Sequence, residues 1–236
     1  MVDLKTITLN NLWYVIGLIV TDGNLSKDGR HINITSKDRK YLFSIKKVMG
    51  LSVKVGRKAR GGSLDKIYSY LQFGDVRFYK FLLNVGLVPK KSLILGHLKI
   101  DENYFCDFLR GVIDGDGSIN SWIHKSNGHE QWALRITSGS RDFMGWLYRE
   151  SQRHLKVIGK VYMYPKRENH NELYILKFGK IAAKIIFKKC YYKNCLSLNR
   201  KLQKSIKCLQ SENGWSRYGT MRSPGVVTGS QIRLKI

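Results

Sequence analysis

Acidic residues are scarce in this chain of 236 amino acids. There are 17 Asp and Glu against 42 Lys and Arg, which gives a formal net charge of +25 at pH 7. The excess is even along the chain, because the first hundred residues hold 18 basic and 6 acidic side chains and the remainder holds 24 and 11. A protein that is basic throughout is expected to bind a polyanion, and nucleic acid is the default candidate.

The chain also lacks long apolar runs and paired cysteines. Its longest apolar stretch, 12–20, is far too short to cross a bilayer, and no secretion signal is evident. The cysteines form no Cys-x-x-Cys pair and have no histidine beside them at zinc-ligand spacing; they are Cys106, Cys190, Cys195 and Cys208. We expect reduced thiols, no membrane partner and a cytoplasmic or organellar-matrix location, with a Cys190–Cys195 bridge as the open alternative.

Two short segments 94 residues apart are nearly the same. One reads VIGLIVTDG over 15–23 and the other reads LRGVIDGDG over 109–117. Each is an apolar, helix-like run that ends in Asp-Gly and carries small residues four apart. These small residues are Gly17 and Thr21 in the first copy and Gly111 and Gly115 in the second. Such spacing lets two helices approach closely, which would place Asp22 beside Asp116 at the negative ends of two helix dipoles.

Two adjacent carboxylates predict a cation between them. At about 5 Å and an effective dielectric near 20 they repel by roughly 3 kcal/mol, and a bound cation reverses that sign. Hard oxygen ligands suit Mg²⁺, which takes the rest of its shell from water and phosphate, and Mn²⁺ or Ca²⁺ are expected to bind as well. The proposed ligands are the carboxylates of Asp22 and Asp116 and the main-chain carbonyls of Thr21 and Gly115. For either Asp taken alone, the alternative is an ordinary turn residue at a helix end.

Further landmarks recur after the two motifs. A turn is predicted over 24–30, strands over 31–36, 53–60 and 66–73, and helices over 38–49 and 75–85. Ile136-Thr137-Ser138 repeats Ile34-Thr35-Ser36 at an offset of 102, and Phe178-Gly179 repeats Phe73-Gly74 at an offset of 105. The sequence therefore predicts an α+β fold of two pseudo-symmetric αββαββα repeats. They span 1–88 and 102–210, with a linker over 89–101 and a basic tail over 211–236 that is weakly structured or draped over the body.

The paired motifs resemble those of the LAGLIDADG homing endonucleases. The second copy fits closely, and the first departs at Val20, where the family often has an acid. The resemblance covers most of residues 8–205. It implies the single-chain form: a DNA-binding saddle of antiparallel sheets, with the two motif helices packed at the interface. It also implies a monomeric, magnesium-dependent enzyme that cuts both strands of a long asymmetric DNA site, leaves short 3′ overhangs and promotes the spread of an intron or intein.

The same resemblance assigns roles around the metal. It gives metal binding to the penultimate acid of each motif, Asp22 and Asp116. It places a polar or basic residue after the second strand of each repeat, which matches Ser36-Lys37 and Ser138-Gly139. Ser36, Lys37 and Ser138 thereby become catalytic candidates, and the Lys37–Gly139 mismatch predicts two unequal active sites. Candidates for a compensating positive charge are Lys90, Lys91, Lys193 and Lys201.

Side chains of the predicted strands and turns are expected to contact DNA. Arg, Asn and Gln suit base edges in the major groove, and lysines suit phosphates. In the first repeat the candidates are Asn24, Lys27, Arg30, Asn33, Lys54, Arg57, Lys58, Arg60, Tyr68, Tyr70 and Gln72. In the second repeat they are Asn120, Trp122, Gln131, Arg135, Lys160, Tyr162, Tyr164, Lys166, Arg167 and Tyr174. Because side chains alternate along a strand, only about half of the strand residues point at DNA.

Two other functions stay open at this stage. One is an intron RNA maturase and the other is a non-cleaving DNA-binding regulator, both on the same scaffold. Neither needs a retained acid pair, which favours the endonuclease. RNA is expected as a partner only for the maturase.

Overall fold

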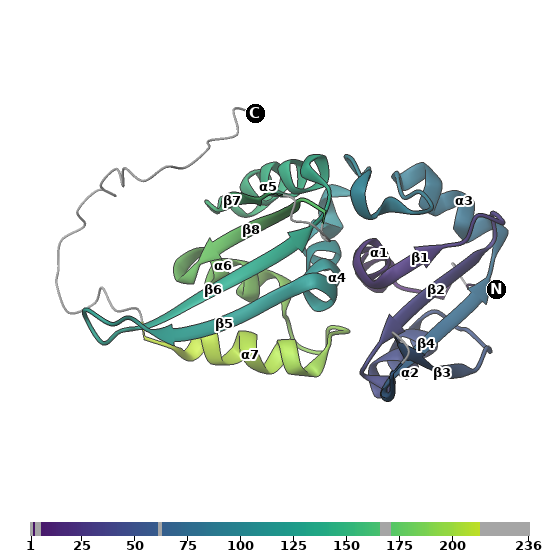
Figure 1. The fold of residues 1–236 in the computed structure, drawn as a ribbon, viewed down its shortest axis with the longest axis horizontal. Helices are drawn as coiled ribbons and strands as arrows, with labels where there is room; N and C mark the ends of the chain where they lie inside the picture. The colour runs from purple at the N-terminus through teal and green to yellow at the C-terminus, as the bar shows by residue number, and fades with distance from the viewer. Residues whose placement is uncertain (1, 3–5, 61–62, 166–170, 213–236) are drawn as a thin grey trace.

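A computed structural model describes residues 2, 6–60, 63–165 and 171–212 of the chain (Figure 1). The side chains of 60 and 63–66 lie outside the description, as does most of the tail predicted over 211–236. No helix within the described ranges is long and apolar enough to span a membrane.

The first half begins with the motif helix, which is followed by two pairs of strands, and each pair is followed by a helix. Its elements are α1 (Leu9–Asp22), β1 (Gly23–Leu25), β2 (His31–Ser36), α2 (Arg39–Val48), β3 (Val55–Arg60), β4 (Ser63–Gly74) and α3 (Val76–Val85). The strands form one antiparallel sheet in the order β1-β2-β4-β3. The predicted helix–strand alternation is confirmed here, and the predicted boundaries agree with the observed ones to within three residues.

The second half repeats this order and adds one helix. Its elements are α4 (Phe105–Asp116), β5 (Gly117–Ile123), β6 (Glu130–Ser138), α5 (Arg141–Leu155), β7 (Lys160–Tyr164), β8 (Leu173–Gly179), α6 (Lys180–Cys190) and α7 (Asn199–Gln210). Its sheet is also antiparallel, in the order β5-β6-β8-β7. Two short 3₁₀ turns, η1 (Lys91–Leu93) and η2 (Glu102–Tyr104), lie in the connection between the halves. The extra helix α7 was not predicted.

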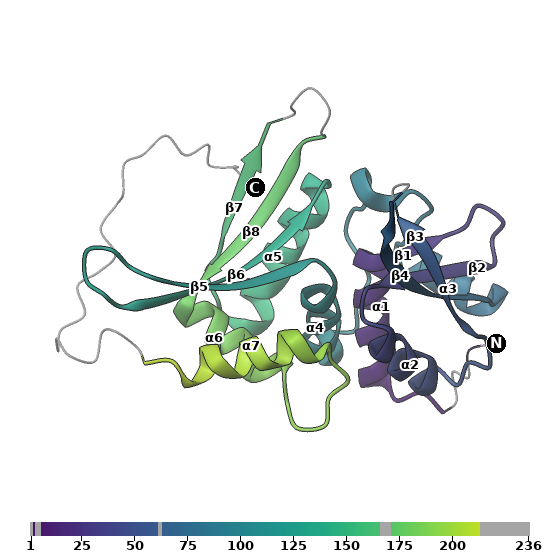
Figure 2. The same cartoon turned by 60° about the horizontal axis from the view of Figure 1, so that its bottom comes forward.

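Strand alternation separates a buried face from an open face in both sheets. In β2, Ile32 and Ile34 are fully buried, whereas Asn33 and Thr35, which alternate with them, stay partly exposed. The helices cover the apolar faces, and the sheets fan out on the other side (Figures 1 and 2). The polar residues of the strands therefore line an open, concave side of the molecule.

The two motif helices, α1 and α4, lie side by side at the centre of the molecule (Figures 1 and 2). Their backbones meet at two glycines. A Cβ atom added at Gly111 would lie 2.8 Å from the Leu18 nitrogen and 3.0 Å from Gly17 Cα, and one at Gly17 would overlap the Phe108 carbonyl. No residue larger than glycine fits either position without moving a helix. The prediction that small residues bring these helices together is confirmed by this contact.

Candidate functional site

Asp22 and Asp116 are the last residues of α1 and α4, and both carboxylates reach the open side of the molecule. The surrounding protein removes water from the Asp22 carboxylate and so raises its pKa to about 6, and the negative charge of Asp116 adds to this shift. Loss of hydration also raises the pKa of Asp116. The structure thus brings the two acids together at the helix ends.

Each acid lies at a helix end, close to main-chain oxygens that have no partner within the helix. The helices end because Gly23 and Gly117 turn to extended backbone, and their N–H groups bond the carbonyls of Ile19 and Ile113. The carbonyls that follow in each chain segment therefore have no partner within the helix. Thr21 and Gly115, the other two predicted ligands, meet across the seam, since the Thr21 side chain fills the space where a Gly115 Cβ would be.

Two buried lysines flank the acid pair. Lys91, in η1, is 7% exposed and donates a hydrogen bond from Nζ to the Gly23 carbonyl. Lys201, in α7, is 4% exposed and donates from Nζ to the Ile113 carbonyl at 3.2 Å. Burial lowers the pKa of each lysine to about 8, and Asp22 opposes that shift in both. The site therefore pairs two crowded carboxylates with two poorly hydrated cations.

Sequence reasoning named these two lysines only among four candidates. Lys91 and Lys201 are 110 residues apart, and each follows another basic residue, Lys90 or Arg200. This offset continues the increasing series of 102 and 105 given by the earlier landmarks. Extending the duplication to residue 201 would therefore have matched Lys201 to Lys91. Arg200, which was not predicted, lines the groove with Asp22 and lowers that carboxyl's pKa, although burial and Asp116 outweigh it.

The turns after β2 and β6 differ in their residues and in their surroundings. Lys37 is exposed, lines the groove and lies with Nζ 5.5 Å from the centre of the Tyr68 ring. At the matching turn, a Cβ on Gly139 would lie 2.7 Å from Leu93 Cδ2 and 3.0 Å from the Ser92 carbonyl. The linker thus occupies the space of a side chain here. Ser36 and Ser138 each accept a hydrogen bond at 3.1 Å from the backbone two residues later, which holds both hydroxyls in their own turns.

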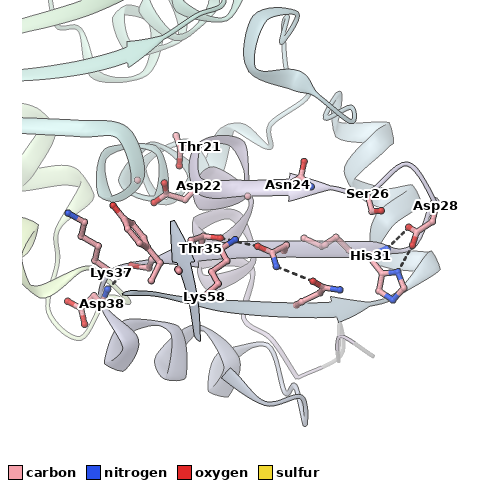
Figure 3. Close-up of a pocket in the computed structure, with 18 of the residues that line it drawn as sticks. Thr21, Asp22, Asn24, Ser26, Asp28, His31, Thr35, Lys37, Asp38 and Lys58 are labelled. Carbon is pink, nitrogen blue, oxygen red and sulfur yellow. Dashed lines mark hydrogen bonds and ion pairs between the residues drawn. The ribbon is translucent and has the colours of Figure 1, made fainter. Parts of the chain in front are cut away.

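A groove of about 1230 Å³ runs along the concave face of the first sheet. Figure 3 shows Asp22 and Thr21 near one end and the hydrogen-bonded pair of Asp28 and His31 at the other. Eight further predicted residues line it: Asn24, Asn33, Ser36, Lys37, Lys58, Tyr68, Gln72 and Gly115. Asp22 and the polar strand residues therefore open onto one continuous groove.

Comparisons with solved structures show the same architecture. The homing endonuclease I-WcaI bound to its DNA recognition sequence aligns with a TM-score of 0.59 and 13% identity, over 85% of this chain and 88% of that one. I-DmoI in complex with DNA and Ca aligns with a TM-score of 0.50 and 15% identity, over 80% of this chain and 92% of that one. No family model matches the chain, and neither does any curated protein. The chain has the LAGLIDADG fold.

In this LAGLIDADG fold, strand register decides which predicted side chains face the concave side of the second sheet. Asn120, Trp122, Gln131 and Arg135 share that face with Lys160, Tyr162 and Tyr164 of β7. Tyr174 was placed wrongly. It has the parity of Leu176 and Phe178, is 5% exposed, and donates its hydroxyl to Glu172 at 2.7 Å. Lys177, which was not predicted, does lie on the concave face and holds Nζ 5.8 Å from the centre of the Trp122 ring.

The first sheet requires a similar correction. Arg57 pairs with Ser69 and shares the parity of buried Val55, so it points to the helix side and not into the groove. Tyr70 faces the groove side, where its ring occupies the space beside Gly56. Lys27, Arg30 and Lys54 are exposed at strand ends. The side chain of Arg60, and all of Lys166 and Arg167, lie outside the described residues.

Proposed function

We propose that this protein is a metal-dependent, site-specific DNA endonuclease. The observation that carries the proposal is the meeting of Asp22 and Asp116 at the ends of two helices in backbone contact, flanked by Lys91 and Lys201. Neither close-packed carboxylates nor two buried lysines are needed for binding DNA alone. Together they suit phosphodiester hydrolysis, in which negative charge builds up on a phosphate.

The donor set fits a hard divalent cation. Both acids reach solvent. Loss of hydration raises the pKa of both, and the charge of Asp116 raises the pKa of Asp22 further, so a bound cation would stabilise the ionised pair. Within the described ranges no three His, Cys, Asp or Glu side chains gather at one point, so carbonyl oxygens, water and phosphate would complete the shell. Such a cation, when bound, would neutralise the scissile phosphate and lower the pKa of a water molecule. We propose Mg²⁺ as the native ion, with Mn²⁺ or Ca²⁺ as substitutes.

The lysines would act on the phosphate and on the leaving oxygen. With a pKa of about 8, Lys91 and Lys201 stay mostly protonated at pH 7 but release a proton more readily than an exposed lysine. Each can therefore stabilise the developing charge and return a proton to the leaving group. Lys37 would add positive charge on one side only, because Gly139 has no side chain to match it.

The concave faces would hold the DNA. Among the paired strand residues of the second sheet, those on this face include Arg135, Lys160 and Lys177 and no acidic residue. Arg and Gln fit base edges, lysines fit phosphates, and the two sheets offer different sets. We infer a long, asymmetric double-stranded site bound by one copy of the chain. By analogy of fold, cleavage would leave short 3′ overhangs and serve the spread of an intron or intein.

A cleavage screen tests this proposal. A random duplex library is incubated with Mg²⁺ and the protein, and cut molecules are sequenced. The wild type is expected to cut a single sequence class. Asp22→Asn and Asp116→Asn should each lose at least 100-fold in double-strand cleavage while binding the selected duplex within about threefold of the wild type.

A control variant separates this loss from a general charge effect. Asp142→Asn makes the same exchange on the exposed first turn of α5 and should leave cleavage unchanged. Full cleavage by both site variants would remove the metal role. A wild type that binds DNA or RNA tightly but cuts no library member would replace the endonuclease with the regulator or the maturase.

A further inference from the structure

Asp114 is a buried acid that the proposed chemistry does not use. It lies on α4, two residues before Asp116, and is 1% exposed. Its carboxylate accepts three hydrogen bonds from three separate segments: Tyr14 Oη at 2.6 Å, Tyr191 Oη at 2.6 Å and the Leu198 backbone nitrogen at 2.7 Å. An acid so completely enclosed and so fully bonded connects α1, α4 and the start of α7.

The bond to Leu198 supplies one of the two contacts of a capping box, from another helix. Leu198 is the N-cap residue of α7, and its side chain offers no oxygen to the first turn. Asp114 accepts a hydrogen bond from the N-cap N–H, which is the contact that an acid at the third helical position makes in a capping box. A carboxylate at this end is also favoured by the helix dipole. The N-terminus of α7 is therefore held by an acid on α4.

The first turn of α7 carries two residues of the site. Arg200 lines the groove with Asp22, and Lys201 donates to the Ile113 carbonyl, one residue before Asp114. Their placement depends on where the first turn of α7 begins, because both follow Leu198 within three residues. Asp114 fixes that starting point.

The first repeat has no equivalent arrangement. Val20 occupies the motif position that matches Asp114 and is 5% exposed among apolar neighbours. Lys91 reaches the site on the short turn η1, whose cap Lys90 makes no side-chain hydrogen bond. The two flanking lysines are thus held by different means.

We propose that Asp114 is a positioning residue that sets Arg200 and Lys201 at the metal centre and so controls cleavage of one DNA strand more than the other. The inference rests on the proposed function for its effect on cleavage. It also predicts a property of the protein without DNA, namely the protection of the first turn of α7.

The first test measures hydrogen exchange in the free protein. Asp114→Asn should speed amide exchange over 198–202 roughly tenfold, because an amide –NH₂ group replaces one of the two oxygens that accept the three hydrogen bonds. The matched control is Asp75→Asn in the first repeat, a buried acid that accepts hydrogen bonds from the backbone nitrogens of Phe78 at 3.0 Å and Val2 at 2.7 Å and makes no contact with the connection to α7. It should lower the melting temperature without selectively exposing 198–202. Unchanged exchange at α7 in Asp114→Asn would overturn the inference.

The second test resolves the two strands of the selected duplex. Asp114→Asn should slow one strand roughly 10–100-fold, as loss of a supporting residue typically does, with DNA affinity within about threefold. The slowed strand should be the one slowed by Lys201→Met and not the one slowed by Lys91→Met. Adding Asp114→Asn to Lys201→Met should cost little more, because both act through the same lysine.

The outcomes separate the two proposals. Equal slowing of both strands, or full additivity with Lys201→Met, would show a merely structural role for Asp114. If the wild type cut no DNA but Asp114→Asn still showed tenfold faster exchange at α7, the proposed endonuclease function would be overturned and the positioning of α7 by Asp114 would stand. A pair of backbone variants gives a final check: Leu198→Pro lacks the N–H and should reproduce Asp114→Asn, whereas Leu198→Ala keeps the N–H and should not.

Discussion

The contact between α1 and α4 makes a sharp prediction about Gly111. In Gly111→Ala the new methyl group would lie 2.8 Å from the Leu18 nitrogen and would overlap the Tyr14 carbonyl. Both obstacles are backbone atoms, so no side-chain rotation relieves the clash, and the helices must separate. Overpacking of this kind typically costs about 1–3 kcal/mol.

The same exchange elsewhere should have the opposite sign. Gly145 lies inside α5, where an added Cβ would meet only Arg149 Nη1 at 3.5 Å. Gly145→Ala should stabilise the protein by about 0.5–1 kcal/mol, because alanine loses less backbone entropy in a helix. The difference between the two variants isolates the steric cost at the seam.

Thermal unfolding followed by circular dichroism measures both. For a chain of this size 1 kcal/mol corresponds to about 2–4 °C, so Gly111→Ala should melt roughly 2–12 °C below the wild type and Gly145→Ala slightly above it. If Gly111→Ala melted as high as Gly145→Ala, the helices would not be in backbone contact, and the proposed pairing of Asp22 with Asp116 would fall with it.

Three further predictions concern the site. Because the pKa of Asp22 is raised to about 6, its ionised fraction falls from about 0.9 at pH 7 to about 0.1 at pH 5, and Mn²⁺ affinity measured by calorimetry should drop roughly tenfold or more over that range. The contribution of Asp22 to the free energy of unfolding of the metal-free protein should instead increase as the pH falls through 6, because the folded state binds this proton more tightly than the unfolded state. A pH-independent Mn²⁺ affinity would refute the assignment. Lys37→Ala should slow one strand and make nicked DNA accumulate, whereas strictly simultaneous cutting by the variant would contradict two unequal sites. The logarithm of DNA affinity should fall linearly with the logarithm of salt concentration, and Lys177→Gln should reduce that slope by about 0.9 if it contacts a phosphate, while Lys80→Gln on α3 should not.

Repetition made the centre of the molecule predictable. The contact between α1 and α4 could be predicted without the path of any loop, because the residues that make it all lie within the two repeated motifs. Strand periodicity likewise located β2, since apolar Ile32 and Ile34 alternate with polar Asn33 and Thr35.

The positions of side chains that depend on strand register or on the path of a loop could not be predicted from the sequence. Tyr174 was predicted to contact DNA as one of the polar side chains of a strand, but its pairing with Met163 places it on the core face. Lys201 arrives through the loop over 191–198, whose path no periodicity describes. Arg110 gave no sign of burial in the sequence, yet it is enclosed by Asp107 and the carbonyls of Cys190 and Leu196.

The hydrogen bond from Tyr14 to Asp114 crosses the seam between the halves, next to the bare glycine contact. Any attempt to build a hybrid by grafting one half of this protein onto half of a relative must therefore conserve more than the target-reading strands. A donor half lacking a hydroxyl at the position of Tyr14 would leave the buried Asp114 carboxyl of the other half without one hydrogen bond, and one with a bulkier residue at the position of Gly17 would force the two helices apart. New sequence preferences are thus best sought by exchanging strand residues within each half, with the joint left untouched.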